Sequence, residues 1–169
     1  MAILLQYAGL RRLEDSNLIA KLQEPFGRVL FERPPLLNDG IMECFETLKS
    51  EGYKIGLISN TGRTWGKFLV EVQKKLGIHH FFEVLTFSDE VRLRKPHEGI
   101  FNLTLKKMKA SPETTVHIGD DIDTDVNGAK AVGMKAVWYN NGTWPDMKCE
   151  DKDIEINHFS KFPEIIRRM

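Results

Sequence analysis

The chain has 169 residues, enough for one domain with a real hydrophobic core, and its 24 lysines and arginines balance its 24 aspartates and glutamates. With 41% hydrophobic and 28% charged residues, its composition is that of a globular protein and not of a disordered chain. No run approaches the ~18 apolar residues of a membrane span. The first residues lack the features of a secretory signal, and the balanced charge argues against a general nucleic-acid binder.

Cysteine usage points to a reducing environment. Cys44 and Cys149 are the two cysteines, and they stand far apart without a CxxC pair or a Cys/His cluster. We therefore expect neither a disulfide scaffold nor a structural zinc site, and a cytoplasmic location.

The first elements in chain order are helical. Apolar residues between Ile3 and Leu22 recur at three- and four-residue spacing, which predicts one or two amphipathic helices. Pro25, Gly27 and the pair Pro34-Pro35 then predict a linker or short irregular segment from residue 24 to residue 35. We expect residues 1–33 to form a small helical piece and residues 34–169 to form the main unit.

Helices and strands alternate in the main unit. The patterns predict strands over residues 53–58, 82–87, 115–118 and, as the last, 135–139. They predict helices from Asn38 or Asp39 to about 50, from about 64 to 76, from Pro96 to about 109, over a stretch that ends at 132, and from 162 to 169. This alternation predicts an α/β fold with a parallel sheet between layers of helices, and functional loops at the carboxyl ends of the strands.

The loop after the first predicted strand reads Ser59-Asn60-Thr61-Gly62. Hydroxyl and amide groups at a strand end, with a helix just beyond, suit an oxyanion because the N–H groups at the start of a helix attract phosphate. Ordinary turn and cap chemistry would use the same four residue types.

The second loop is Arg94-Lys95-Pro96. The proline holds the backbone of Lys95 extended, so that its ammonium group could bind a phosphate oxygen or balance carboxylates. The alternative is a solvated surface lysine.

The third loop follows an apolar strand and contains Asp120, Asp121, Asp123 and Asp125 after Gly119. Four aspartates would repel one another without a counter-ion, and magnesium commonly binds one or two carboxylates together with water and substrate phosphate. Aspartates also favour the first turn of a helix, which accounts for one or two of the four. We expect Asp120, at the strand end, to be the metal ligand, and Asp121 and Asp123 to face solvent.

The order of these loops resembles motifs two, three and four of the haloacid dehalogenase superfamily, whose members are mostly magnesium-dependent phosphatases. The resemblance extends from about residue 36 to residue 140 and implies a three-layer Rossmann-like core. It implies that Ser59, with Asn60 and Thr61, binds the phosphoryl group and that Lys95 stabilises it. It also implies that Asp120 binds Mg²⁺ and that Asp125 supports that site or Lys95.

The first motif of this superfamily is missing. It is an Asp-x-Asp sequence after an apolar strand, which supplies the nucleophile and the general acid, and nothing before Ser59 matches it: Asp15 lies in polar helical sequence and Asp39 precedes a helix. In the family that strand lies between the strands of motifs two and four. We therefore expect an amino-terminally truncated phosphatase with a remnant of a helical cap, weak stability as an isolated chain, and negligible turnover.

The expected full-length reaction is magnesium-dependent hydrolysis of a small phosphorylated metabolite, with a partner chain or a missing amino-terminal segment completing the site. The alternative is a non-catalytic phosphate-binding or partner-dependent protein. A dehalogenase of the same superfamily would need no metal, so the aspartate-rich loop favours a phosphatase. In response-regulator receivers the acidic pair comes first in the chain, whereas here it comes last.

Overall fold

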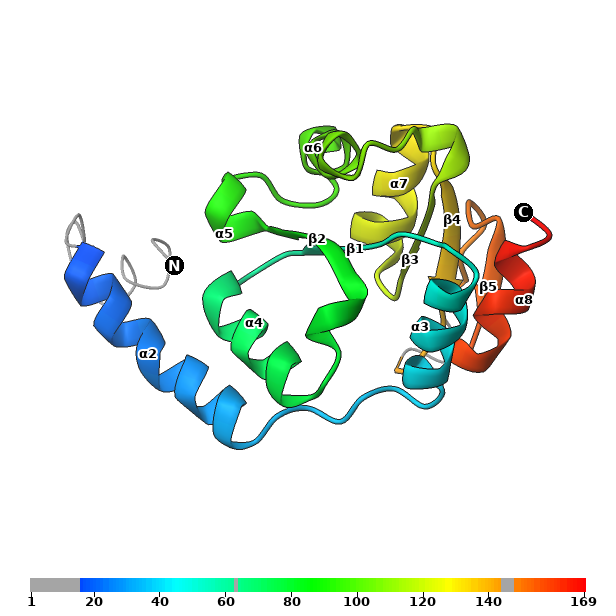
Figure 1. The fold of residues 1–169 in the computed structure, drawn as a ribbon. Helices are drawn as coiled ribbons and strands as arrows, with labels where there is room; N and C mark the ends of the chain where they lie inside the picture. Colours follow the sequence, from blue (N-terminus) through cyan, green and yellow to red (C-terminus); the bar gives the residue numbers. More distant parts are fainter. Residues whose placement is uncertain (1–15, 63, 144–147) are drawn as a thin grey trace.

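The computed structural model describes residues 16–62, 64–143 and 148–169 (Figure 1). The helices are α2 (Ser16–Glu32), α3 (Ile41–Ser50), α4 (Gly66–Lys75), α5 (Ser88–Val91), α6 (Glu98–Met108), α7 (Gly128–Ala131) and α8 (Phe162–Ile166). The strands are β1 (Ile55–Ser59), β2 (Phe82–Phe87), β3 (Val116–Gly119), β4 (Lys135–Tyr139) and β5 (Ile154–Ile156). A π-helical segment, Ile122–Asn127, leads into α7. Within these residues no helix is both long and apolar enough to cross a membrane.

The strands form two parallel sheets. β1 pairs with β2, and β4 lies between β3 and β5. In Figure 1, α6 and α7 lie above the strands and α3 and α4 lie below them. This arrangement confirms the predicted α/β fold of parallel strands between helical layers.

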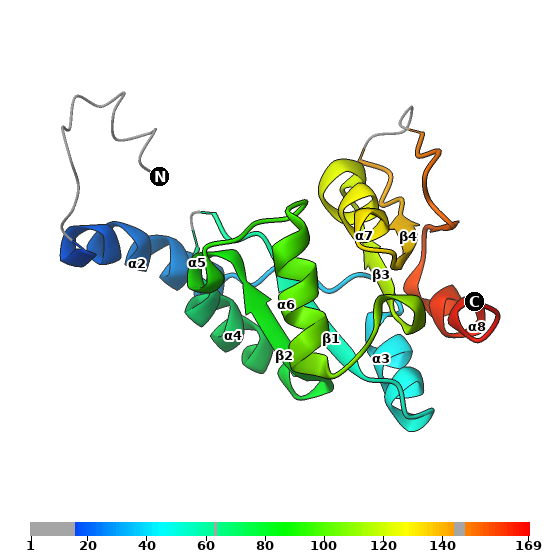
Figure 2. The same ribbon diagram turned by 90° about the horizontal axis from the view of Figure 1, so that it is seen from above.

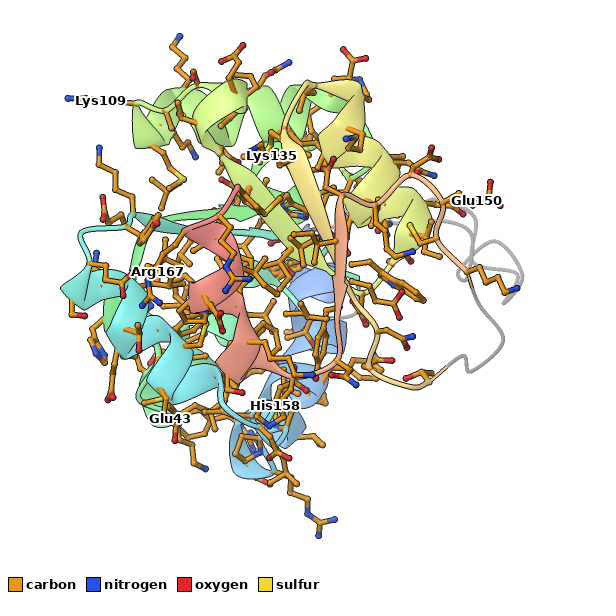
Figure 3. All side chains as sticks on the ribbon, turned by 90° about the vertical axis from the view of Figure 1, so that its right-hand side faces the viewer. Glu43, Lys109, Lys135, Glu150, His158 and Arg167 are labelled. Carbon is orange, nitrogen blue, oxygen red and sulfur yellow. The ribbon has the colours of Figure 1, made fainter. Side chains whose placement is uncertain are left out.

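Two hydrophobic clusters pack on opposite faces of β4. Ala136 and Trp138 belong to a cluster with residues of α6 and α7, whereas Val137 belongs to a cluster with residues of α3 and α8. The alternation follows from the two-residue period of a strand. On the side seen in Figure 3, α8 lies beside α3, and Arg167 donates hydrogen bonds from Nε to both carboxylate oxygens of Glu51, at 3.1 and 3.0 Å.

The expectation of a linker from residue 24 to residue 35 was wrong for most of its length, because α2 continues through Pro25 to Glu32. A proline inside a helix removes a backbone hydrogen bond, but packing on α4 compensates for it. Gly27 is buried, and a Cβ there would lie 2.4 Å from the ring of Phe68. The Nζ of Lys75 also donates to the carbonyl of Phe31 at 2.7 Å. The part of the predicted helices before Ser16 lies outside the described residues.

Two further expectations need correction. Neither Asn38 nor Asp39 caps α3: Gly40 is the N-cap, with φ of +76°, a left-handed conformation that glycine adopts without strain. The strand at 135–139 is not the last, because β5 pairs with β4 in parallel. β5 has only three residues, too few to give a recognisable strand pattern, and it lies in a strongly acidic stretch of the sequence.

β1 and β3 are not paired with each other. Between them lies a cavity of about 870 Å³, which we call the slot; both strands line it along most of their length. Figure 2 shows β1 and β2 on one side and β3 and β4 on the other, with α6 beside β1 and β2. The resemblance places the missing strand of motif one between these two strands.

Candidate functional site

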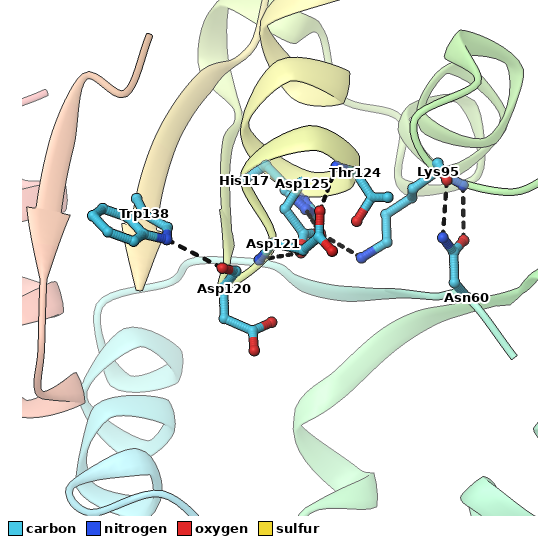
Figure 4. A network of polar contacts seen from close by, with 8 residues as sticks. All are labelled: Asn60, Lys95, His117, Asp120, Asp121, Thr124, Asp125 and Trp138. Carbon is cyan, nitrogen blue, oxygen red and sulfur yellow. Dashed lines mark hydrogen bonds and ion pairs between the residues drawn. The ribbon is translucent and has the colours of Figure 1, made fainter. Parts of the chain in front are cut away.

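The three predicted loops meet at the carboxyl ends of β1 and β3 (Figure 4). Asn60, which follows β1, holds the backbone of Lys95 from both sides: its Nδ2 donates to the Lys95 carbonyl at 2.9 Å, and its Oδ1 accepts from the Lys95 N–H at 2.7 Å. The Lys95 ammonium in turn pairs with the carboxylate of Asp125, in the loop after β3. The chain of contacts therefore joins the ends of both half-sheets.

Asp125 is the centre of this network. Its side chain is 6% exposed, and its Oδ1 accepts from Lys95 and lies 2.8 Å from the Nε2 of His117, while its Oδ2 accepts from the N–H of Asp121 at 3.3 Å. Burial alone would raise the pKa of Asp125, but the hydrogen bond from His117 and the charge of Lys95 outweigh it and lower the pKa to about 2. An ionised carboxylate only accepts, so the His117 Nε2 carries the proton.

The glycine at the end of β3 makes this geometry possible. A Cβ on Gly119 would lie 2.2 Å from the Cγ of Asp125 and 2.4 Å from its Oδ2, well inside van der Waals contact. Only a residue without a side chain lets the carboxylate fold back over the strand end toward Lys95 and His117.

Sequence reasoning missed His117. It stands in the middle of β3, and its ring packs edge-on against Phe101 of α6, with centroids 5.3 Å apart. A histidine inside an otherwise apolar strand was the available signal, but its partner Asp125 is identified only by the fold.

The aspartates of the third loop take separate roles. Asp120 is exposed: its Oδ2 accepts from the Nδ2 of Asn141 at 3.0 Å, and its carbonyl accepts from the indole of Trp138 at 3.1 Å. Asp121 and Asp123 are exposed, as expected. Asp121 caps the π-helical segment by accepting from the N–H of Thr124 at 2.8 Å.

Ser59 and Thr61 differ in their surroundings. Ser59 ends β1 and is half-buried. Thr61 is buried and turned toward α5: its N–H donates to the hydroxyl of Ser88 at 2.9 Å, and its hydroxyl donates to Asp89 at 2.6 Å. Asp89 also accepts from the N–H of Gly66 at 3.2 Å, at the start of α4. These contacts fix the loop after β1, and no sequence pattern pointed to Ser88 or Asp89.

The residues suit a magnesium ion only in part. Asp120 offers one exposed carboxylate, whereas both oxygens of Asp125 already accept hydrogen bonds from Lys95, His117 and Asp121. In the parts of the chain that the structure describes, no three acidic, histidine or cysteine side chains gather closely enough to hold a metal ion. One carboxylate is within the range that magnesium uses when water and substrate phosphate complete its shell.

Known proteins give a consistent picture. The model of the haloacid dehalogenase-like hydrolases matches residues 4–133. A glyceraldehyde 3-phosphate phosphatase of Pyrococcus furiosus is 35% identical over 129 residues, 75% of this chain and 52% of that protein. A protein of the same name from Methanothermobacter thermautotrophicus is 42% identical over 96 residues, 56% of this chain and 40% of that protein.

Among solved structures, a phosphatase of this family from Thermococcus onnurineus superposes with a TM-score of 0.73 at 30% identity, covering 83% of this chain and 64% of that one. The chain spans about half the length of the curated relatives it matches. The family match, the similarity to phosphatases and the arrangement of Ser59, Lys95 and Asp120 around one sheet edge agree, and the chain belongs to the haloacid dehalogenase-like hydrolases.

Proposed function

We propose that this chain carries the phosphate- and metal-binding part of a magnesium-dependent phosphatase that acts on a small phosphate monoester. The observation that carries the proposal is the position of Lys95 between the ends of the two half-sheets, where Asn60 holds its backbone and Asp125 pairs with its largely buried ammonium. A fixed cation at the carboxyl edge of a parallel sheet is suited to stabilise the charge of a transferring phosphoryl group.

In this proposal each residue has a distinct task. The hydroxyl of Ser59 donates to a phosphoryl oxygen, and Lys95 neutralises the negative charge of the same group. Asn60 and Thr61 hold the loop of Ser59, since their side chains are engaged with Lys95 and Asp89. Asp125 pairs with the ammonium of Lys95 and holds it in place, and it is therefore a positioning residue.

Asp120 is the proposed magnesium ligand. The ion would supply further charge neutralisation for the phosphate, with the remaining ligands from water, the substrate and an additional carboxylate. That carboxylate is part of what the chain lacks, because no acidic residue before Ser59 follows an apolar strand. We accordingly expect the chain by itself to bind Mg²⁺ and phosphate weakly and to hydrolyse phosphate esters at a negligible rate.

The missing nucleophile also favours a second candidate, a phosphate-binding protein without catalysis. The two candidates share Ser59, Lys95 and Asp120 and differ in turnover once a nucleophilic segment is added. Since relatives are named glyceraldehyde 3-phosphate phosphatases, glyceraldehyde 3-phosphate is the first metabolite to test beside p-nitrophenyl phosphate.

The first test is calorimetric titration of the chain with Mg²⁺ in the presence of inorganic phosphate. Asp120→Asn should weaken Mg²⁺ binding at least about tenfold, since it removes the proposed ligand charge. The matched control is Asp123→Asn, an exposed carboxylate of the same loop, which should bind as the unchanged chain does. Equal binding by both variants would contradict the metal assignment.

A further inference from the structure

The loop that follows β4 lies against the segment that carries Asp120. β3 and β4 are parallel neighbours, with Gly119 opposite Trp138 in the register, so the segments that leave their carboxyl ends run side by side. Asp120 follows Gly119 directly, and the loop after β4 contains Asn140 and Asn141. The pairing of the two strands therefore brings this loop within reach of Asp120.

Two residues that β4 positions hold Asp120 at separate points. The indole N–H of Trp138, a buried side chain, donates to the backbone carbonyl of Asp120 at 3.1 Å, as Figure 4 shows. The Nδ2 of Asn141 donates to Oδ2 of the Asp120 carboxylate at 3.0 Å. The backbone and the carboxylate of Asp120 are thus each held by one contact, which limits the rotation of its side chain.

The orientation of the Asn141 amide follows from its second contact. The Oδ1 of Asn141 accepts from the N–H of Thr143 at 2.9 Å. A backbone N–H only donates, so the amide oxygen must face Thr143 and the amide NH₂ group must face Asp120. Asn141 therefore offers the carboxylate a donor whose direction is fixed by the turn of its own loop.

This hydrogen bond makes the two carboxylate oxygens of Asp120 unequal. Oδ2 accepts from Asn141, whereas Oδ1 accepts no hydrogen bond from the residues that the structure describes. Asp120 is exposed and lines the slot, so Oδ1 is the oxygen that a cation can approach. A carboxylate held in this way is suited to bind a metal ion through one oxygen.

Binding through one oxygen suits magnesium better than calcium. Magnesium prefers a near-ideal octahedral shell at about 2.0–2.1 Å, and the two oxygens of one carboxylate lie too close together to fill two positions of such a shell. Calcium has a larger and more flexible shell at about 2.3–2.6 Å and accepts carboxylates through both oxygens. For binding through both oxygens, Oδ2 of Asp120 would have to turn toward the ion and away from Asn141.

We propose that Asn141 is a positioning residue that holds Asp120 as a one-oxygen ligand and thereby favours magnesium over calcium at this site. The inference rests on the proposed function, in which Asp120 is the magnesium ligand. Replacing the hydrogen-bond partner of a metal ligand typically changes metal affinity by about 10–100-fold. Because both residues are exposed, we expect an effect at the lower end of this range.

The test measures metal affinity in the full 169-residue chain, without substrate or turnover. Mn²⁺ takes oxygen ligands as magnesium does, and electron paramagnetic resonance measures its free concentration. Bound Mn²⁺ is displaced with Mg²⁺ in one titration and with Ca²⁺ in another, which gives the ratio of the Ca²⁺ to the Mg²⁺ dissociation constant. Asn141→Leu keeps the approximate size of the side chain but removes the donor, and it should lower this ratio about tenfold.

Asn140→Leu is the matched control, at the neighbouring asparagine of the same loop. The Asn140 side chain donates to Glu155 at 2.9 Å and accepts from the N–H of Gly142 at 3.1 Å, and within the described residues it has no hydrogen bond to Asp120. This variant should keep the ratio of the unchanged chain. A general loosening of the loop would weaken the binding of both ions alike and would leave the ratio as it is.

Two results would overturn the inference. One is a ratio that Asn141→Leu leaves unchanged, whether both affinities fall together or neither does. The other is an equal fall of the ratio in Asn140→Leu, which would assign the effect to the loop and not to the contact with Asp120.

Asp120→Asn separates this inference from the proposed function. If the unchanged chain and this variant bind Mn²⁺ equally, Asp120 is not the metal ligand, and both proposals fail. If Asp120→Asn loses Mn²⁺ binding while Asn141→Leu keeps the ratio, the metal assignment stands and only the role of Asn141 fails.

Discussion

The Lys95–Asp125 pair offers the sharpest quantitative prediction, through the variant Asp125→Asn. The pKa of Asp125 is lowered from its ordinary value of 3.8 to about 2. Since one pKa unit corresponds to about 1.4 kcal/mol, ionised Asp125 adds roughly 2–3 kcal/mol to the free energy of unfolding. Asparagine keeps the shape but loses the charge, and it leaves the ammonium of Lys95, 11% exposed, without its counter-ion.

Breaking a buried pair from one side costs about 3–5 kcal/mol, so the two estimates together suggest a loss near 3 kcal/mol. For a chain of this length, 1 kcal/mol shifts the thermal midpoint by about 2–4 °C. We expect Asp125→Asn to lower the midpoint at pH 7 by about 6–12 °C, measured by circular dichroism. Lys95→Met in the Asp125→Asn background should restore part of the loss, because it removes the unpaired buried charge.

The sign of the pH dependence follows from the lowered pKa. A carboxyl group whose pKa is depressed by folding stabilises the protein above its unfolded value of 3.8, and this contribution disappears as the pH falls toward 2. The difference between the unchanged chain and Asp125→Asn should therefore be constant from pH 7 to pH 5 and shrink between pH 4 and pH 2. Asp123→Asn, in the same loop but exposed, is the control. A deficit that is equal at pH 7 and pH 2.5 would refute the electrostatic account.

Two further experiments test the packing around Asp125 and around Cys44. Gly119→Ala places a Cβ against the Asp125 carboxylate and should therefore raise the pKa of Asp125 toward its ordinary value, which NMR titration can follow. An unchanged pKa would show that the loop carrying Asp125 can move aside. Burial raises the pKa of the Cys44 thiol to about 11. In a Cys149→Ser background, iodoacetamide should therefore react with Cys44 at pH 8 much more slowly in the folded chain than in urea; equal rates would place the thiol in solvent.

Much of the fold was predictable because local patterns agreed with tertiary packing. The predicted bounds of β2 and β4, residues 82–87 and 135–139, match the structure, since each is an apolar run with β-branched or aromatic residues. β1 and β3 were predicted within two residues of their observed bounds.

The incorrect or missing predictions also have physical causes. Pro25 signals a break, yet α2 continues through it because Gly27 packs against Phe68 of a helix that lies some forty residues further along the chain. The partner of His117 is eight residues away and reaches it only through the turn after Gly119. Local sequence carries the propensity of each residue, whereas these two features depend on contacts that exist only after the elements pack.

The division of the site between two half-sheets has a consequence for ligand binding. Ser59 and Asn60 belong to the half-sheet of β1, and Asp120 and Asp125 belong to that of β3. The distance between the proposed phosphate and metal groups is therefore set by the width of the slot.

The contacts of Lys95 fix the distance between β1 and β3 only at the carboxyl ends of these strands. Along the rest of their length, the described residues of β1 and β3 share no ladder of hydrogen bonds. A strand in the slot would fix the width along the whole length of β1 and β3.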